Sequence, residues 1–266
     1  MELNIKDDFD LKVIAESGQC FRFNQINDNL YKINAYNKIL HVEKVKDKTF
    51  RFDCSEKEFK DIWSLYFDLE TDYSKIRRKA SADSFLKECA KYSEGMRILN
   101  QDRWEMIISF IISQRKSIPA IKTSIERLSK LCGDKIAEDD YAFPTPVQIL
   151  SASYESLASC GLGYRLDYIK NAAEKFYSNP SLINEYDKLD DSSLFEELKS
   201  LQGIGDKVAS CVALFGYHRL DFFPKDVWIN RALAEHYPEG YDMSRFAPYN
   251  GVMQQYIFYA FRSEKR

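Results

Sequence analysis

The spacing of apolar residues changes along this chain, and that change constrains the fold more than any other feature. Between Leu11 and about Phe52, apolar and polar residues alternate around turn signals such as "NDN" and "KDK", which predicts an antiparallel sheet with one solvated face. Beyond residue 55 the apolar spacing is helical nearly to the end. The pattern predicts an α+β protein, with a β-rich amino-terminal domain that also holds helices, residues 1–95, and an all-helical domain, residues 96–266.

Charge and cysteine spacing narrow the class of protein. The 266 residues carry a formal net charge of −3, so a nucleic-acid site would have to be a local basic face. Residues 97–131 hold seven basic and three acidic side chains, which suits such a face, although ordinary solvated helix surfaces give the same pattern. The six cysteines form no close pairs, which argues against a zinc site or a disulfide framework. Without a signal peptide or a transmembrane-length run, we expect a cytoplasmic protein that does not bind a membrane.

The segment "LQGIGDKVASC", residues 201–211, is typical of a tight turn between two helices, and we place the whole hairpin at about 194–215. Gly203 and Gly205 permit positive φ and let another molecule approach the turn closely. Amides of the turn and of the following helix start would form a positive nest suited to a phosphate. A plain helical hairpin that needs glycine for its turn is the alternative.

Two side chains in and after this hairpin are candidates for chemistry. Lys207 falls in the first turn of the second helix, where the helix dipole opposes a positive charge by roughly 0.3–1 kcal/mol. Such a position is unusual for a surface lysine and suits a nucleophile. Asp226 precedes "VWINRAL" and is expected to cap that helix, a role compatible with facing a positive charge on a ligand. A solvated lysine and a purely structural cap remain the alternatives.

Five further stretches, together with this hairpin, resemble one family in order along the chain. They are "ESGQCFRF" near the start, "NQDRWEMIISFIISQ", "GLGYR" at 161–165, "PKDVWINR" and "YNGVMQQYIFYAFR" at 249–262. The chain resembles the helix-hairpin-helix (HhH-GPD) DNA glycosylases, and among them the 8-oxoguanine DNA glycosylases, as a bacterial member. The resemblance covers nearly the whole chain and implies a sheet domain packed on a two-part helical core, with the damaged base flipped into the cleft between them.

The resemblance also implies a bifunctional reaction. Lys207 would attack the deoxyribose C1′ and form a Schiff base, which permits a β-elimination that nicks the strand (AP lyase activity). Asp226 would stabilise the cationic sugar. The chemistry needs no cofactor and no metal, and the iron–sulfur cysteines of some relatives are absent. A monovalent cation held by the backbone carbonyls of Leu201 and Gly205 is a possibility that the resemblance carries.

The family's recognition residues carry over position by position. A backbone carbonyl at Gly18 would accept the N7–H that distinguishes 8-oxoguanine from guanine. Cys211 and Phe258 would sandwich the base, and Gln254 would read its Watson–Crick edge. The residues that the resemblance assigns to DNA binding are Gly203, Gly205, Tyr164, Arg165, Arg115 and Trp228.

Some positions depart from the pattern of eukaryotic members. Where those members carry an asparagine triplet, this chain has Arg115, Lys116 and Ser117, and Ala120 stands in place of a following arginine. Trp228 replaces a histidine near the sugar phosphate. In those members the asparagines and the arginine contact the cytosine opposite the lesion. Because this chain lacks them, we expect a weakened preference for cytosine.

The expected partner is double-stranded DNA containing 8-oxoguanine, bound by a monomer. Three alternatives remain. The first is a glycosylase for other damaged bases on the same scaffold. The second is a non-catalytic helix-hairpin-helix DNA-binding protein. The third, a helical nucleotide-binding enzyme, lacks the G-x-x-x-x-G-K-[ST] phosphate loop.

Overall fold

The amino-terminal part of the chain is built on one antiparallel sheet with strand order β1-β5-β4-β3-β2. A computed structural model describes residues 1–264. In the central pair of strands Ile33 lies opposite Leu40, and both are buried because alternate side chains share one face of a sheet. The strands are β1 (Glu2–Asn4), β2 (Phe23–Gln25), β3 (Leu30–Ala35), β4 (Lys38–Lys46) and β5 (Thr49–Phe52).

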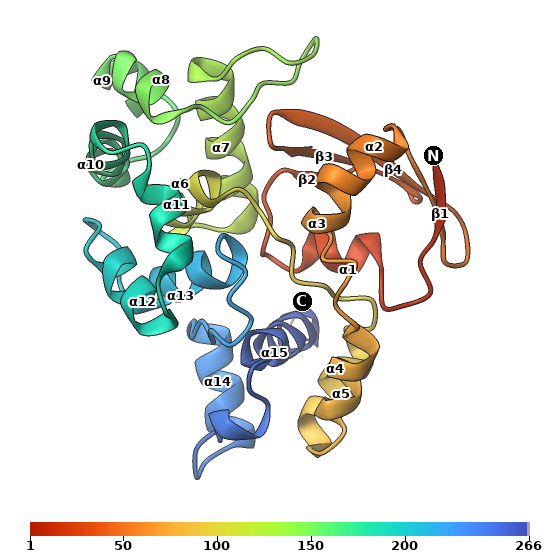
Figure 1. Cartoon of the computed structure of the whole chain (residues 1–266). Helices are drawn as coiled ribbons and strands as arrows, with labels where there is room; N and C mark the ends of the chain where they lie inside the picture. Colours follow the sequence, from red (N-terminus) through yellow and green to blue (C-terminus); the bar gives the residue numbers. More distant parts are fainter. Residues whose placement is uncertain (265–266) are drawn as a thin grey trace.

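Helices lie beside the sheet and make up the rest of the protein (Figure 1). Those of the first 95 residues are α1 (Leu11–Glu16), α2 (Glu56–Glu58), the π-helical turn η1 (Phe59–Trp63), α3 (Ser64–Tyr66), α4 (Tyr73–Ala80) and α5 (Ser84–Tyr92). Those that follow are α6 (Arg103–Ser113), α7 (Ile118–Cys132), α8 (Pro146–Ser151), α9 (Tyr154–Ala158), α10 (Arg165–Ser178), α11 (Leu182–Glu185), η2 (Tyr186–Lys188), α12 (Asp191–Lys199), α13 (Asp206–Phe215), α14 (Val227–His236), η3 (Met243–Arg245) and α15 (Asn250–Glu264). The predicted α+β architecture is confirmed.

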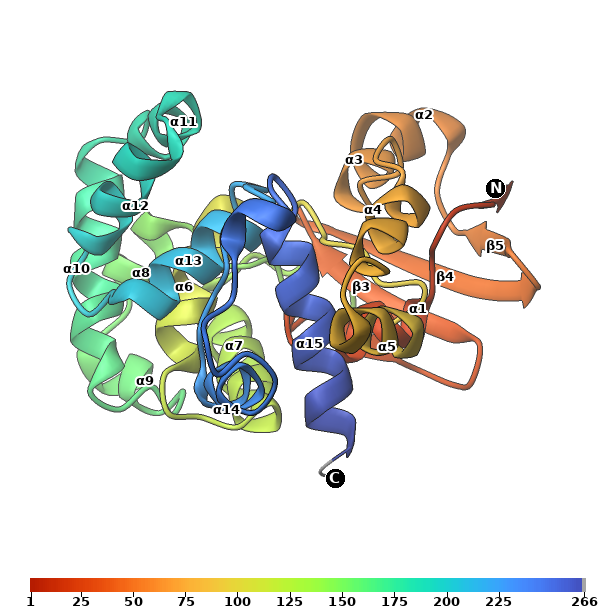
Figure 2. The same ribbon diagram turned by 90° about the horizontal axis from the view of Figure 1, so that it is seen from below.

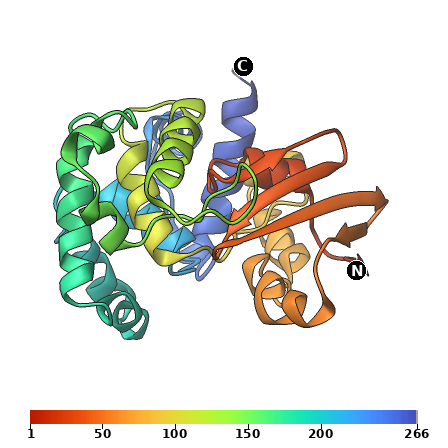
Figure 3. The same ribbon diagram turned by 90° about the horizontal axis from the view of Figure 1, so that it is seen from above.

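Two hydrophobic clusters hold the molecule together. The sheet packs on α1, η1 and α3 through side chains such as Phe52 and Trp63. The helices form a larger cluster around α6, α13 and α15. Helices α4 and α5 join this second cluster, since α5 packs against α15, and α15 lies between the sheet and the other helices (Figures 2 and 3). The division of the chain near residue 95 stays a prediction.

One predicted element is wrong. The alternating pattern was expected to give strand from Leu11, but residues Leu11–Glu16 form helix α1. The reason is a cap: the Asp10 carboxylate accepts hydrogen bonds from the amides of Lys12 and Val13, at 2.9 and 3.0 Å. An aspartate before an apolar turn is an N-terminal helix signal, and it outweighs an alternation of only six residues.

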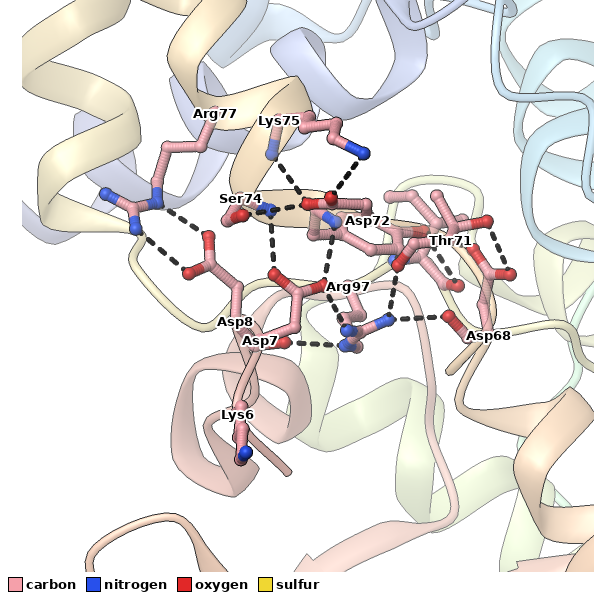
Figure 4. A network of polar contacts seen from close by, with 12 residues as sticks. Lys6, Asp7, Asp8, Asp68, Thr71, Asp72, Ser74, Lys75, Arg77 and Arg97 are labelled. Carbon is pink, nitrogen blue, oxygen red and sulfur yellow. Dashed lines mark hydrogen bonds and ion pairs between the residues drawn. The ribbon is translucent and has the colours of Figure 1, made fainter. Parts of the chain in front are cut away.

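A buried guanidinium joins the amino terminus to the segment that leads into the helical part (Figure 4). Arg97 is fully buried. It donates to the carbonyls of Asp8 and Asp68 at 2.6 and 2.5 Å and pairs with the Asp7 carboxylate at 2.6 Å. Asp7 also accepts from the first amides of α4, at Tyr73 and Ser74. Arg97 is therefore a structural residue and contributes nothing to a basic DNA-binding face.

No helix within residues 1–264 combines the length and apolar character needed to cross a membrane.

Candidate active site

A cleft of about 340 Å³ lies where the sheet part meets the helices. Its walls come from the loop after α1, the end of α6, the start of α7, and helices α13, α14 and α15. Seven residues named in the sequence analysis line it together, and they are Lys207, Asp226, Gly18, Phe258, Trp228, Lys116 and Ser117. Gly18 and Phe258, 240 residues apart in the sequence, thus meet around one cavity.

Lys207 reaches the cleft from the first turn of α13. Its Nζ lies 5.4 Å from the centre of the Phe110 ring, so an apolar surface backs the amine. The neighbouring carboxylate, Asp206, pairs instead with Lys199 at 3.1 Å. Within residues 1–264 no carboxylate forms an ion pair with Lys207, which leaves the amine available to a ligand.

Cys211 lies one helical turn after Lys207 and is 3% exposed. Burial raises the pKa of its thiol, and the adjacent Lys207 ammonium opposes that rise. The side chain is therefore a neutral, polarisable thiol at physiological pH. In the described part of the chain it does not line the cleft itself, and it sits beneath the lysine that does.

Asp226 has the predicted capping role and also lines the cleft. Its Oδ1 accepts a hydrogen bond from the amide of Ile229 at 2.8 Å. Two positions on, Trp228 forms part of the wall, and the Arg231 guanidinium lies 5.5 Å from its ring centre. A carboxylate fixed by its own helix opens towards the same cavity as Lys207, so a cap and a catalytic group are compatible here.

Gly18 and Phe258 pack against each other in the opposite wall of the cleft. Gly18 has φ of +79°, and a Cβ there would lie 3.1 Å from Cε1 of Phe258. The left-handed backbone favours glycine here, and a Cβ would need the Phe258 ring to move by a few tenths of an ångström. Gln254 is buried one turn earlier on α15, and its Oε1 accepts from Gln255 at 2.9 Å. The cleft wall does not include Gln254 in the part of the chain that the structure describes.

The hairpin between α12 and α13 has the expected helix-turn-helix form. Gly203 has φ of +81°, and a Cβ there would overlap the Tyr168 ring at 2.2 Å. Gly205 does not use the freedom to adopt positive φ: its backbone is extended with φ of −98°, and a Cβ there would meet nothing within 4 Å. The fold therefore demands only the first glycine, and the second leaves open space above the helix start.

The carbonyls proposed for a monovalent cation are each used once. Leu201 O accepts from the Ile204 amide at 3.1 Å, and Gly205 O accepts from the Ala209 amide at 2.9 Å. A carbonyl has two lone pairs, so one remains on each oxygen, and the cation stays a prediction. Among residues 1–264 no group of three or more His, Cys, Asp or Glu side chains could hold a metal.

The wedge loop places its two candidate residues differently. Tyr164 is 50% exposed and packs edge-on against Tyr168 at 5.8 Å. Arg165 is 6% exposed, and its guanidinium donates to the carbonyls of Gln114 and Leu162. In this conformation Tyr164 can enter a duplex, whereas Arg165 ties the loop to the turn after α6.

The turn after α6 holds the residues that replace the asparagine triplet. Arg115 is exposed and has φ of +52°. Lys116 donates to the Gly161 carbonyl and to Ser124 Oγ, both at 2.6 Å. Burial lowers the pKa of Lys116, helped by the nearby positive charge of Arg165. Lys116 thus anchors the wedge loop, and Arg115 is the free side chain of the turn.

Seven wall residues were not singled out from the sequence, and they are Phe21, Phe110, Ser113, Ile118, Pro119, Ile121 and Arg262. Phe110 sits in a helix that is apolar on every side, so no periodicity marks it. Arg262 follows Phe258 by four positions, and its guanidinium lies 5.7 Å from that ring. This i, i+4 spacing was the one available signal.

Comparison with known proteins identifies the class. Residues 108–242 match the HhH-GPD superfamily of base excision DNA repair proteins, and residues 2–107 match the N-terminal domain of 8-oxoguanine DNA glycosylase. The structure of MBOgg1 in complex with a low-affinity DNA ligand is 36% identical, with a TM-score of 0.94, over 100% of this chain and 96% of that chain. The chain belongs to the HhH-GPD superfamily.

Within that superfamily, two further relatives are named as glycosylase/lyases. A Clostridium acetobutylicum 8-oxoguanine glycosylase/lyase, in complex with DNA containing cytosine opposite 8-oxoG, is 33% identical with a TM-score of 0.92 over 100% of this chain and 99% of that one. A probable N-glycosylase/DNA lyase of Methanothermobacter thermautotrophicus is 30% identical over 66% of this chain. The chain spans 62% of that archaeal relative's length. It is a member of the 8-oxoguanine DNA glycosylase family.

Proposed function

We propose that this protein is a bifunctional glycosylase that excises 8-oxoguanine from duplex DNA and then nicks the strand as an AP lyase. The observation that carries the proposal is the single cleft shared by Lys207, Asp226, Gly18 and Phe258. An amine without an ion-pair partner, a fixed carboxylate, a close-packed glycine and an aromatic ring are what excision of a flipped purine requires.

In the proposed reaction Lys207 first gives up its ammonium proton, and the freed amine forms a bond to C1′ as the bond from C1′ to the base breaks. The base leaves with the bonding electron pair and takes up a proton. The Asp226 carboxylate stabilises positive charge on the sugar while that bond breaks. Opening of the sugar ring gives the Schiff base. Loss of a C2′ proton then expels the 3′ phosphate with its electron pair, which nicks the strand.

The wall opposite the lysine would select the base. The tight spacing between Gly18 and Phe258 lets a planar base stack on the ring while its N7–H meets the backbone beside the glycine. We propose the neutral Cys211 thiol for the other face of the base; because Cys211 lies outside the cleft wall and beneath Lys207, that contact would require the lysine side chain to move. For Gln254, a rotation of its side chain would be needed, since its oxygen is bonded to Gln255.

The hairpin would hold the DNA backbone. Gly205 has open space around its Cα and caps the start of α13, where free amides and the helix dipole favour a phosphate. Tyr164 would fill the gap left by the flipped base. Because Lys116 and Arg165 are engaged with backbone carbonyls, we propose that the opposite base is read loosely, chiefly by Arg115.

We further propose that the protein acts as a monomer in a bacterial cytoplasm, without a cofactor. A reducing compartment fits the six free thiols of the structure. Double-stranded DNA with 8-oxoguanine is the proposed partner.

Lys207→Gln tests the proposal directly. We expect the variant to bind duplex DNA containing 8-oxoguanine, to lose excision, and to give no covalent adduct when borohydride reduces the Schiff base. Lys170→Gln is the matched control, because Lys170 lies on α10 over the Tyr154 ring and outside the cleft. Excision by Lys207→Gln at the wild-type rate would refute the nucleophile. A wild-type protein that binds without excising any damaged base in a panel would instead indicate a DNA-binding module.

A further inference from the structure

A second cavity, of about 450 Å³, opens at the amino-terminal end of α6. Residues at the other end of the same helix line the candidate active site. Since α6 has 11 residues, it is about 16 Å long, so the two cavities are separate. The aromatic side chains of Trp104, Phe143 and Phe176 line the second cavity, and its acidic groups are Asp102 and Glu105.

Glu105 is the unusual member of this cavity. It is 7% exposed, and within residues 1–264 its carboxylate has neither a hydrogen-bond donor nor an ion-pair partner. Buried carboxyl groups nearly always have a partner. Burial raises the pKa of this carboxyl to about 8; Asp102 and Glu126 add to the rise, and Arg22 opposes it.

Three polar groups near Glu105 make their hydrogen bonds to other residues. Arg22 pairs with Glu126 at 3.2 Å and donates to the Tyr141 carbonyl. The Trp104 Nε1 donates to the Pro144 carbonyl at 2.8 Å, and the Tyr36 hydroxyl donates to the Asn100 carbonyl at 2.6 Å. Trp104 and Tyr36 thus have no spare donor, and Arg22, which keeps further N–H groups, makes its hydrogen bonds to Glu126 and Tyr141 and not to Glu105.

The walls indicate what could supply the missing donors. With a pKa of about 8, Glu105 holds a proton at neutral pH, and a cationic ligand would displace that proton on binding. The carboxylate then accepts two parallel N–H bonds from one planar group, and aromatic side chains favour a flat apolar body beside that group. The volume is that of a small-molecule pocket. We propose that this cavity binds a small planar molecule with an amidine-type edge, whose paired N–H groups contact Glu105 and whose flat body packs against Trp104, Phe143 and Phe176.

Benzamidine is the simplest probe of this chemistry. Titration calorimetry on the whole protein should show saturable binding, with a dissociation constant in the millimolar range or lower. Benzamide has the same size but carries an acceptor in place of one donor, and we expect it to bind at least tenfold more weakly. Glu105→Gln should weaken benzamidine binding at least tenfold. Glu174→Gln is the matched control, since Glu174 is exposed on α10 outside the cavity wall and its loss should change binding less than threefold.

Two more variants locate the binding. Ile183→Trp adds bulk to the cavity wall and should abolish binding even if Glu105→Gln proves unstable. Lys207→Gln alters the DNA cleft and should leave benzamidine binding unchanged. This inference can therefore be tested independently of the proposed reaction. The proposal is overturned if the wild-type protein shows no saturable binding, if benzamide binds as tightly, or if Ile183→Trp binds as the wild type does.

Discussion

The two glycines of the hairpin turn should respond in opposite ways to the same added methyl group. At Gly203, alanine would have to adopt φ of +81° with its Cβ 2.2 Å from the Tyr168 ring. At Gly205, alanine would keep an ordinary extended backbone and meet nothing within 4 Å. The pair therefore separates what the fold requires of the turn from what a ligand requires of it.

The size of each effect follows from these contacts. A left-handed alanine costs about 1–2 kcal/mol, and the Tyr168 ring must move by roughly 1 Å, an overpacking cost of about 1–3 kcal/mol. Gly203→Ala should thus lower the free energy of unfolding by about 2–5 kcal/mol, or the midpoint of thermal unfolding by at least about 4 °C. For Gly205→Ala, a gain of about 0.4–1 kcal/mol from the stiffer unfolded chain offsets the loss of a better cap, so stability should hardly change.

DNA affinity, unlike stability, should be lowered by the substitution at Gly205. The methyl group of Gly205→Ala would occupy the space proposed for a phosphate, and we expect about tenfold weaker binding, or about 1.4 kcal/mol. Fluorescence anisotropy with a duplex carrying a stable abasic analogue measures the affinity, and chemical denaturation measures the stability. Equal stability losses in the two variants, or wild-type DNA affinity for Gly205→Ala, would refute the reasoning.

Three other expectations follow from the site. Asp226→Asn should slow single-turnover excision at least about tenfold, or 1.4 kcal/mol, with little change in stability because asparagine caps equally well; an unchanged rate would leave Asp226 as a cap only. Excision opposite adenine, guanine or thymine should fall within roughly a hundredfold of excision opposite cytosine, about 2.7 kcal/mol, and a preference of many thousandfold on the four duplexes would contradict loose reading. The pKa of Glu105 is about 8 in the folded protein against an ordinary 4.5, so the folded state holds a proton that the unfolded state has released. Stability should therefore fall between those pH values by up to about 1.4 kcal/mol per pH unit, and Glu105→Gln should flatten that slope in denaturation measured across the range.

The sequence predicted those parts of the site that depend on local motifs. Lys207 and Asp226 could be identified because each occupies a helix start with a recognisable approach, and both line one cleft. The tight turn at Gly203 was also indicated by its glycine, which has a left-handed backbone, whereas Gly18 was assigned from the family resemblance. The sequence could not tell which glycine of the hairpin is left-handed, because Gly203 and the extended Gly205 are the same residue type.

The hydrogen-bond partners of individual side chains could not be predicted from the sequence. Arg165 and Lys116 looked like free cations, and only the packing of the wedge loop on the turn after α6 turns both onto backbone carbonyls. Helix α1 was missed because its cap, Asp10, was read against an alternating pattern of six residues. The lone carboxyl of Glu105 was equally invisible, since burial and the loss of partners arise from elements far apart in the chain.

The buried guanidinium of Arg97 bears on how the molecule comes apart. It bonds to Asp7, Asp8 and Asp68, so separating the amino-terminal segment would remove its carboxylate partner, Asp7, and leave a desolvated positive charge on backbone carbonyls alone, at a cost of several kcal/mol. A protein with two hydrophobic clusters could lose them one at a time. Here the loss of one cluster alone would break the Arg97 contacts and is therefore unfavourable. The sheet and the helices should unfold in a single cooperative transition.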